Sequence, residues 1–191
     1  MTAKILAFAG SSRAESFNKK LVATAANAAR AAGGEVTLVD LRDYPMPVYD
    51  GDLEAASGLP EHAKRMKALF LAHDGLLISC PEYNSSISAL LKNTIDWVSR
   101  PAPGETSLQC FDGKVAALLA ASPGALGGLR GLVHVRAILG NIGVIVLPTQ
   151  IAVGRAQEAF GPDGKLKDAK QQASVERLAA QLVTTVGKLR G

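Results

Sequence analysis

Short apolar runs alternate with amphipathic stretches along this chain, and that alternation constrains its fold more than any other feature. Five runs have the length and composition of buried strands: Lys4–Gly10, Glu35–Asp40, Gly75–Ser79, Lys114–Ala121 and Gly143–Leu147. An alternation of this kind is typical of a parallel sheet covered by helices. The first run is apolar on both faces, which predicts a central strand.

Helical periodicity fills the segments between these runs. The predicted helices cover Leu21–Ala32, Pro60–Ala72, Ile87–Val98, Leu129–Leu139 and a last segment that starts near Asp168, with Gln171 three residues further on. A connection rich in Pro, Gly and Asp spans Leu41–Leu59. Five strands alternating with five helices predict an α/β, flavodoxin-like three-layer fold with a five-stranded parallel sheet of order 2-1-3-4-5. We expect residues 1–191 to form a single domain.

Composition excludes several classes of protein. With 48% hydrophobic and 20% charged residues, the chain has the balance of a globular protein. No apolar run reaches the roughly 20 residues that a membrane helix needs. The apolar stretch Ile5–Ala9 is too brief for a secretory signal, and Cys80 and Cys110 have no paired spacing. We therefore expect a cytoplasmic protein with no membrane partner.

Charge and histidine placement give two further expectations. The formal net charge is +4, the basic residues are scattered, and only 5% of residues are aromatic, so nucleic acid is not an expected partner. His62, His73 and His134 have no metal-ligand spacing, and we expect no metal site.

In a sheet of this order, ligands bind beyond the carboxyl ends of the strands where the strand order reverses, here between the first and third strands. The loop after the first strand is Gly10–Asn18, with donors at Ser11, Ser12, Ser16 and Asn18 beside a helix N-terminus. Backbone N–H groups and the helix dipole make such a place suitable for a phosphate, and Arg13 adds charged donors. The alternative is a turn whose hydroxyls only cap the helix.

Two further loops face the same predicted edge. The third strand is followed by Cys80–Ser86, in which Tyr83 and Asn84 can border a planar heterocycle; the alternative is a capping loop with a surface tyrosine. The fourth strand is followed by Ser122–Gly128, whose glycines expose backbone N–H groups that can bind the polar edge of a ring. Its alternative is a loose turn without a ligand. The chain has no GxGxxG, P-loop or GxSxG motif, and a buried structural thiol is the favoured role of Cys80.

These loops together resemble the NADPH-dependent FMN reductase family, flavodoxin-like enzymes that reduce quinones, azo compounds, free flavin or chromate. The resemblance rests on Gly10–Asn18, Pro81–Ile87, Leu91–Trp97 (LKNTIDW), Ser122–Gly128 and, after the second strand, Leu41–Asp50. It implies FMN as cofactor and NADPH or NADH as co-substrate. It also implies that a hydride passes to flavin N5 and two electrons pass on to a small-molecule acceptor. No protein acid or base is needed for that, and no catalytic residue is assigned.

Carried over residue by residue, the resemblance implies three groups of FMN-binding residues. The phosphate would be held by Ser11, Arg13, Ser16, Phe17 and Asn18. The isoalloxazine ring would be lined by Pro81, Glu82, Tyr83, Asn84 and Ser85, with its pyrimidine side along Ser122, Gly124, Ala125, Leu126 and Gly127.

The resemblance also implies a homodimer or homotetramer, and it leaves open whether Glu82 and Arg100 serve the interface or the flavin. Ser88 stands where many relatives carry a proline, and we expect it to leave the following helix start less rigid. Two rival functions stay open from sequence. One is a flavodoxin-like electron carrier without NAD(P)H turnover of its own, and the other is a flavin-binding regulatory subunit.

Overall fold

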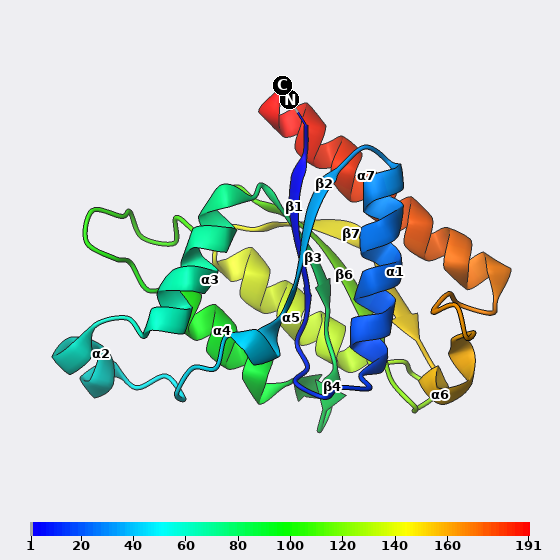
Figure 1. Cartoon of the computed structure of the whole chain (residues 1–191), viewed down its shortest axis with the longest axis horizontal. Helices are drawn as coiled ribbons and strands as arrows, with labels where there is room; N and C mark the ends of the chain where they lie inside the picture. The colour runs from blue at the N-terminus through cyan, green and yellow to red at the C-terminus, as the bar shows by residue number, and fades with distance from the viewer. Residues whose placement is uncertain (1) are drawn as a thin grey trace.

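The computed structural model describes residues 2–191 as a central sheet between two layers of helices (Figure 1). All neighbouring strands of the sheet are parallel, in the order β2-β1-β3-β6-β7. The strands are β1 (Lys4–Ala9), β2 (Glu35–Asp40), β3 (Gly75–Ser79), β6 (Val115–Ala121) and β7 (Ile145–Val153). A separate hairpin of β4 (Glu82–Tyr83) and β5 (Ser86–Ile87) lies between β3 and β6 in the chain. With that hairpin set aside, the order is the predicted 2-1-3-4-5, and the predicted fold class is confirmed.

The two helical layers cover opposite faces of the sheet. One layer consists of α1 (Phe17–Ala31) and α7 (Ala169–Arg190), and the other of α3 (Glu61–Ala72), α4 (Ala89–Ser99) and α5 (Leu129–Asn141). Along β1, Ile5 packs toward the first layer and Leu6 toward the second, and the alternation continues to the strand end. Because both faces are buried, the central strands are apolar without interruption in the sequence.

Three short elements lie in stretches predicted as connections: a 3₁₀ turn at Leu41–Asp43, α2 (Gly51–Ser57) and α6 (Ala156–Ala159). Helix α2 has no buried residue, so it has no apolar stripe by which a sequence pattern could reveal it. It is instead started by Asp50, whose carboxylate accepts hydrogen bonds from the N–H groups of Asp52 and Leu53.

Strand β7 is longer than predicted, because the apolar run that ends at Leu147 suggested a stop before Pro148. β7 is an edge strand, and its register against β6 shifts between Ala116 and Leu118, which accommodates the proline. The guanidinium of Arg136 donates to the carbonyl of Leu147 at 2.8 Å, satisfying a group that the irregularity leaves outside the ladder. The strand then continues to Val153.

The LKNTIDW segment holds the connection after β2. The side-chain amide of Asn93 donates to the carbonyl of Pro47 at 2.8 Å and accepts from the N–H of Tyr49 at 2.8 Å. Trp97 donates its indole N–H to the same carbonyl of Pro47, also at 2.8 Å. This motif therefore anchors a loop through side-chain bonds to its backbone.

The two cysteines and the lengths of the helices can be compared with the sequence expectations. Cys80 and Cys110 are buried free thiols, and burial raises the pKa of both, which fits structural roles. Within residues 2–191, no helix combines the length and the apolar character required to cross a bilayer.

Candidate functional site

The structure brings the three predicted loops together at one edge of the sheet. The N–H of Gly10 donates to the carbonyl of Ser79 at 2.9 Å, and the N–H of Cys80 donates to Leu119 at 2.7 Å. The N–H of Ser122 continues the ladder to Val153 at 3.0 Å. The segment between β1 and α1 and the β4–β5 hairpin lie at the lower edge in Figure 1. Consecutive ladder bonds thus fix where each loop begins.

The loop after β1, residues 10–18, carries uncovered donors at the start of α1. Ser16 is the N-cap residue of α1, yet its side chain makes no capping hydrogen bond. The first intrahelical bond runs from the N–H of Lys20 to the carbonyl of Ser16, so the N–H groups of the first turn have no acceptor within the helix. This geometry speaks against the reading in which the serines only cap the helix.

Arg13 stands at the exposed part of the same loop. Its backbone N–H donates to the buried Ser11 hydroxyl at 3.3 Å. Within residues 2–191 its guanidinium makes no ion pair or hydrogen bond, so its charged donors face solvent. A loop with a buried hydroxyl, an uncapped helix start and a cation has the donor chemistry of a phosphate site.

The side chains of Phe17 and Asn18 lie differently from the sequence expectation. Phe17 stacks on Phe160, with ring planes 3° apart and centroids at 6.3 Å. The side-chain amide of Asn18 is bonded to the ends of β3 and β6. The side-chain oxygen and nitrogen of Asn18 are therefore both bonded within the chain, and the backbone N–H groups of these two residues remain for a ligand.

The β4–β5 hairpin turns through two residues with positive φ, Asn84 at 51° and Ser85 at 65°. Positive φ at both central positions is the conformation of a type I′ turn, which Asn-Gly adopts most easily. A serine in the left-handed region is strained. Tyr83, the last residue of β4, is about half exposed, and β4 lies at the same edge as the segment between β1 and α1 (Figure 1).

Glu82 and Arg100 are both bound within the chain. The Glu82 carboxylate accepts from the N–H of Gly131 at 3.0 Å, in the first turn of α5, and pairs with Arg130 at 3.1 Å. This places a negative charge at a helix N-terminus, where it is favourable. Arg100 pairs with Glu54 of α2 at 2.9 Å. The Glu82 side chain, predicted to line a ring, bonds to the start of α5 in this structure.

Ser88, expected to leave the helix start less rigid, has a capping role at that start. It is the N-cap of α4, and its hydroxyl accepts from the N–H of Leu91 at 3.1 Å. The same hydroxyl donates to the carbonyl of Gly10 at 2.6 Å, so it ties the loop after β1 to α4. Sequence reasoning missed this role, although a serine three residues before an apolar helical position is a capping signal.

Glycines determine the path of the loop after β6, Ser122–Gly128. Gly127 has φ of 62°, and a Cβ there would lie 2.7 Å from the backbone nitrogen of Gly154. The N–H of Gly124 contacts the Ser122 hydroxyl at 3.3 Å, and residues 123–126 are exposed. The loop therefore presents its own backbone at the edge, with the Leu126 side chain about half exposed.

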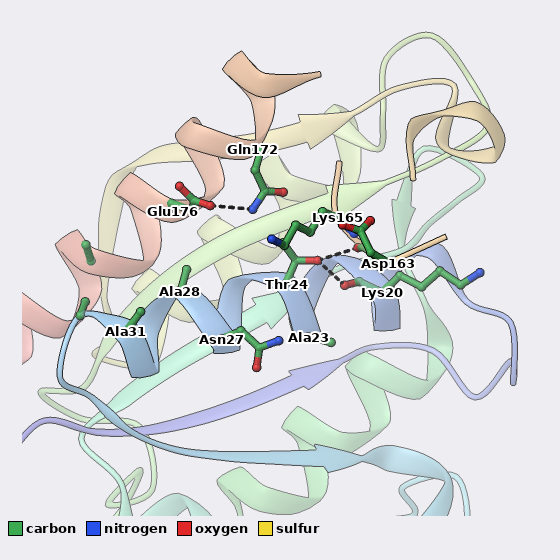
Figure 2. A pocket seen from close by; sticks show the side chains of 13 residues that line it. Lys20, Ala23, Thr24, Asn27, Ala28, Ala31, Asp163, Lys165, Gln172 and Glu176 are labelled. Carbon is green, nitrogen blue, oxygen red and sulfur yellow. Dashed lines mark hydrogen bonds between the residues drawn. The ribbon is translucent and has the colours of Figure 1, made fainter. Parts of the chain in front are cut away.

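A cavity of about 760 Å³ lies elsewhere, between α1, α7 and the loop at 161–165 (Figure 2). Alanine methyl groups and side chains of both charges line it, and Thr24 in its wall contacts the carbonyls of Lys20 and Gly164 at 3.0 Å. None of the predicted site residues line this cavity. It is therefore separate from the edge at which the three loops meet.

Comparison with known proteins gives consistent matches. The model of the NADPH-dependent FMN reductase family matches residues 3–158. The NAD(P)H-dependent FMN reductase of Pseudomonas aeruginosa is 35% identical over 98% of this chain and 97% of its own. The quinone reductase of Escherichia coli K12 is 30% identical over 94% and 91%. Among solved structures, the flavoenzyme NAD(P)H:(acceptor) oxidoreductase FerB of Paracoccus denitrificans has a TM-score of 0.82, with 27% identity and 98% of both chains covered.

The strained hairpin yields a stability prediction. Ser85→Gly should raise the free energy of unfolding by about 1 kcal/mol, because glycine adopts positive φ without steric cost. Asn84→Gly is the matched control and should gain less, since asparagine tolerates the left-handed region better than serine does. Urea denaturation of the three proteins measures both changes. Equal gains at the two positions would contradict the assignment of strain to Ser85.

Proposed function

This chain belongs to the NADPH-dependent FMN reductase family, and from that premise we propose that it passes electrons from NAD(P)H through FMN to a small-molecule acceptor. The family places it among the FMN- and NAD(P)H-dependent oxidoreductases. The relatives are named NAD(P)H-dependent FMN reductase and quinone reductase, which favours an enzyme over an electron carrier or a regulatory subunit. What the residues at the sheet edge contribute is binding and orientation.

The uncapped start of α1 is the observation that carries the proposed cofactor site. The residues fit the phosphate of FMN. Its oxygens would accept hydrogen bonds from the N–H groups of the first turn, from the hydroxyls of Ser11 and Ser16, and from the guanidinium of Arg13. Phe17 and Asn18 would contribute their backbone N–H groups. The phosphate would thereby satisfy donors that the chain itself leaves without an acceptor in the helix.

The isoalloxazine ring would lie between the other two loops. Pro81 and the hairpin residues Tyr83, Asn84 and Ser85 would border it on one side, with the backbone of Glu82. Ser122 and residues 124–127 would follow its pyrimidine edge, where the exposed Ala125 and Leu126 would offer backbone N–H groups that stabilise negative charge on a ring. Bound FMN supplies hydride acceptance at N5 and two-electron transfer, so the protein needs to provide only position and electrostatics.

We propose quinones as the first class of acceptor, because the relatives from Pseudomonas putida and Escherichia coli carry the name quinone reductase. Azo compounds, free flavin and chromate are further proposed acceptors. The half-exposed side chains of Tyr83 and Leu126 are suited to contact a flat, largely apolar acceptor of the quinone kind. NADPH or NADH would occupy the same open side before the acceptor does.

We also propose that the chain assembles as a homodimer or homotetramer. Leu129 and Val133 lie one turn apart on the outer face of α5 and are 42% and 57% exposed, which is apolar surface that a second copy could cover. Sedimentation velocity should therefore show two or four chains per particle. Val133→Lys should shift the distribution toward the monomer. A wild-type protein that sediments as a monomer would contradict the proposed assembly.

The proposed function predicts a yellow protein that bleaches on addition of NADPH under anaerobic conditions, because reduction removes the visible flavin absorption. Adding a benzoquinone should restore the spectrum, and steady-state NADPH oxidation should depend on the quinone. A spectrum that stays oxidised with both NADPH and NADH would favour the electron carrier. A colourless protein that fails to bind added FMN would overturn the assigned cofactor.

Arg13→Ala should weaken FMN binding by about 1.5–3 kcal/mol, because it removes charge-assisted hydrogen bonds to the phosphate. Quenching of flavin fluorescence during titration of the apoprotein measures the dissociation constant. Arg177→Ala removes the same charge from an exposed position on α7 and is the control. An FMN dissociation constant as low in Arg13→Ala as in the control would remove Arg13 from the phosphate site.

A further inference from the structure

The Asn18 side chain makes two hydrogen bonds to the backbone of Ala121, a residue of another loop's strand. Its Nδ2 donates to the carbonyl of Ala121 at 2.8 Å, and its Oδ1 accepts from the N–H of the same residue at 3.0 Å. Asn18 lies in the first turn of α1, and Ala121 is the last residue of β6, directly before the loop that starts at Ser122. This reciprocal pair fixes the distance between the start of α1 and that loop.

Ser79 adds the third strand end to the same network. Its buried hydroxyl donates to Asn18 Oδ1 at 2.8 Å, while its carbonyl accepts from the N–H of Gly10 at 2.9 Å. The loop at 10–18 is thus held near both of its ends by Ser79, through backbone at Gly10 and through a side chain at Asn18. All the polar side-chain atoms involved are buried, where a lost partner costs most.

We propose that Asn18 is a positioning residue whose side chain, with the Ser79 hydroxyl, sets the spacing between the phosphate-binding loop and the ring-binding loops. This inference rests on the proposed FMN site. It assigns the Asn18 side chain a task other than ligand contact, because its amide oxygen and nitrogen both bond to protein groups.

The physical reason lies in the shape of the ligand. FMN joins a phosphate to a ring through a ribityl chain, so its two ends bind together only when the two subsites have the right separation. Such a linked ligand gains affinity through effective concentration, and it loses that gain when the geometry no longer permits simultaneous contact. Shifting the loop against the ring subsite should therefore weaken FMN while leaving a ligand without the phosphate almost unaffected.

The test compares FMN with riboflavin, which has the ring and ribityl chain but lacks the phosphate. In Asn18→Ala, the FMN dissociation constant should rise about tenfold or more, and that of riboflavin should change less than about threefold. The control is Asn93→Ala, because Asn93 makes the same pair of bonds to a loop backbone, at Pro47 and Tyr49. In the control, the ratio of the two constants should equal that of the wild type.

Ser79→Ala keeps the result decisive if Asn18→Ala does not fold. It removes one bond of the network and should reduce the preference for FMN over riboflavin in the same direction, by a smaller factor. A parallel loss of both ligands in the variants, or an unchanged ratio with only a lower melting temperature, would overturn the positioning role. A wild-type protein that binds neither ligand would overturn the proposed function itself, and these outcomes are distinguishable.

Discussion

The backbone at the carboxyl ends of β1, β3 and β6 is the constraint on which the site depends. Each of these strands is buried on both faces, so polar groups can gather only where the strands stop. There the ladder continues for one more residue at Gly10, Cys80 and Ser122, and each loop leaves the sheet from a fixed point. The separation of the loops is therefore set by the sheet itself, before any side chain of the site is considered.

The sequence was most informative where burial on both faces governs the residue pattern. The five sheet strands and the long helices have a strong apolar signal, and their order followed from handedness and alternation. Elements with no buried face escaped prediction, as α2 shows. The end of β7 was also missed, because the proline at 148 is compatible with an edge strand once Arg136 satisfies the neighbouring carbonyl.

At the site, the sequence identified the loops but not the partners of their side chains. The pattern Gly10–Asn18 pointed to a phosphate loop, and the uncapped Ser16 agrees with that reading. Nothing in the spacing could show that Asn18 pairs with Ala121, which is 103 residues away. The same holds for Glu82 and its bond to Gly131, since both contacts exist only after the sheet has brought distant loops together.

These contacts divide the site residues into two kinds. The side chains of Asn18, Glu82 and Ser88 bond to protein backbone and hold loops or helix starts in place. The groups left facing outward are backbone N–H groups, the guanidinium of Arg13 and the half-exposed side chains of Tyr83 and Leu126. Backbone donors held by buried contacts cannot relax toward a ligand, so the affinity of such a site depends on how accurately the loops are placed. Under the proposed function, discrimination among acceptors would fall to the outward side chains, because they can change at this edge without disturbing the contacts that position the loops.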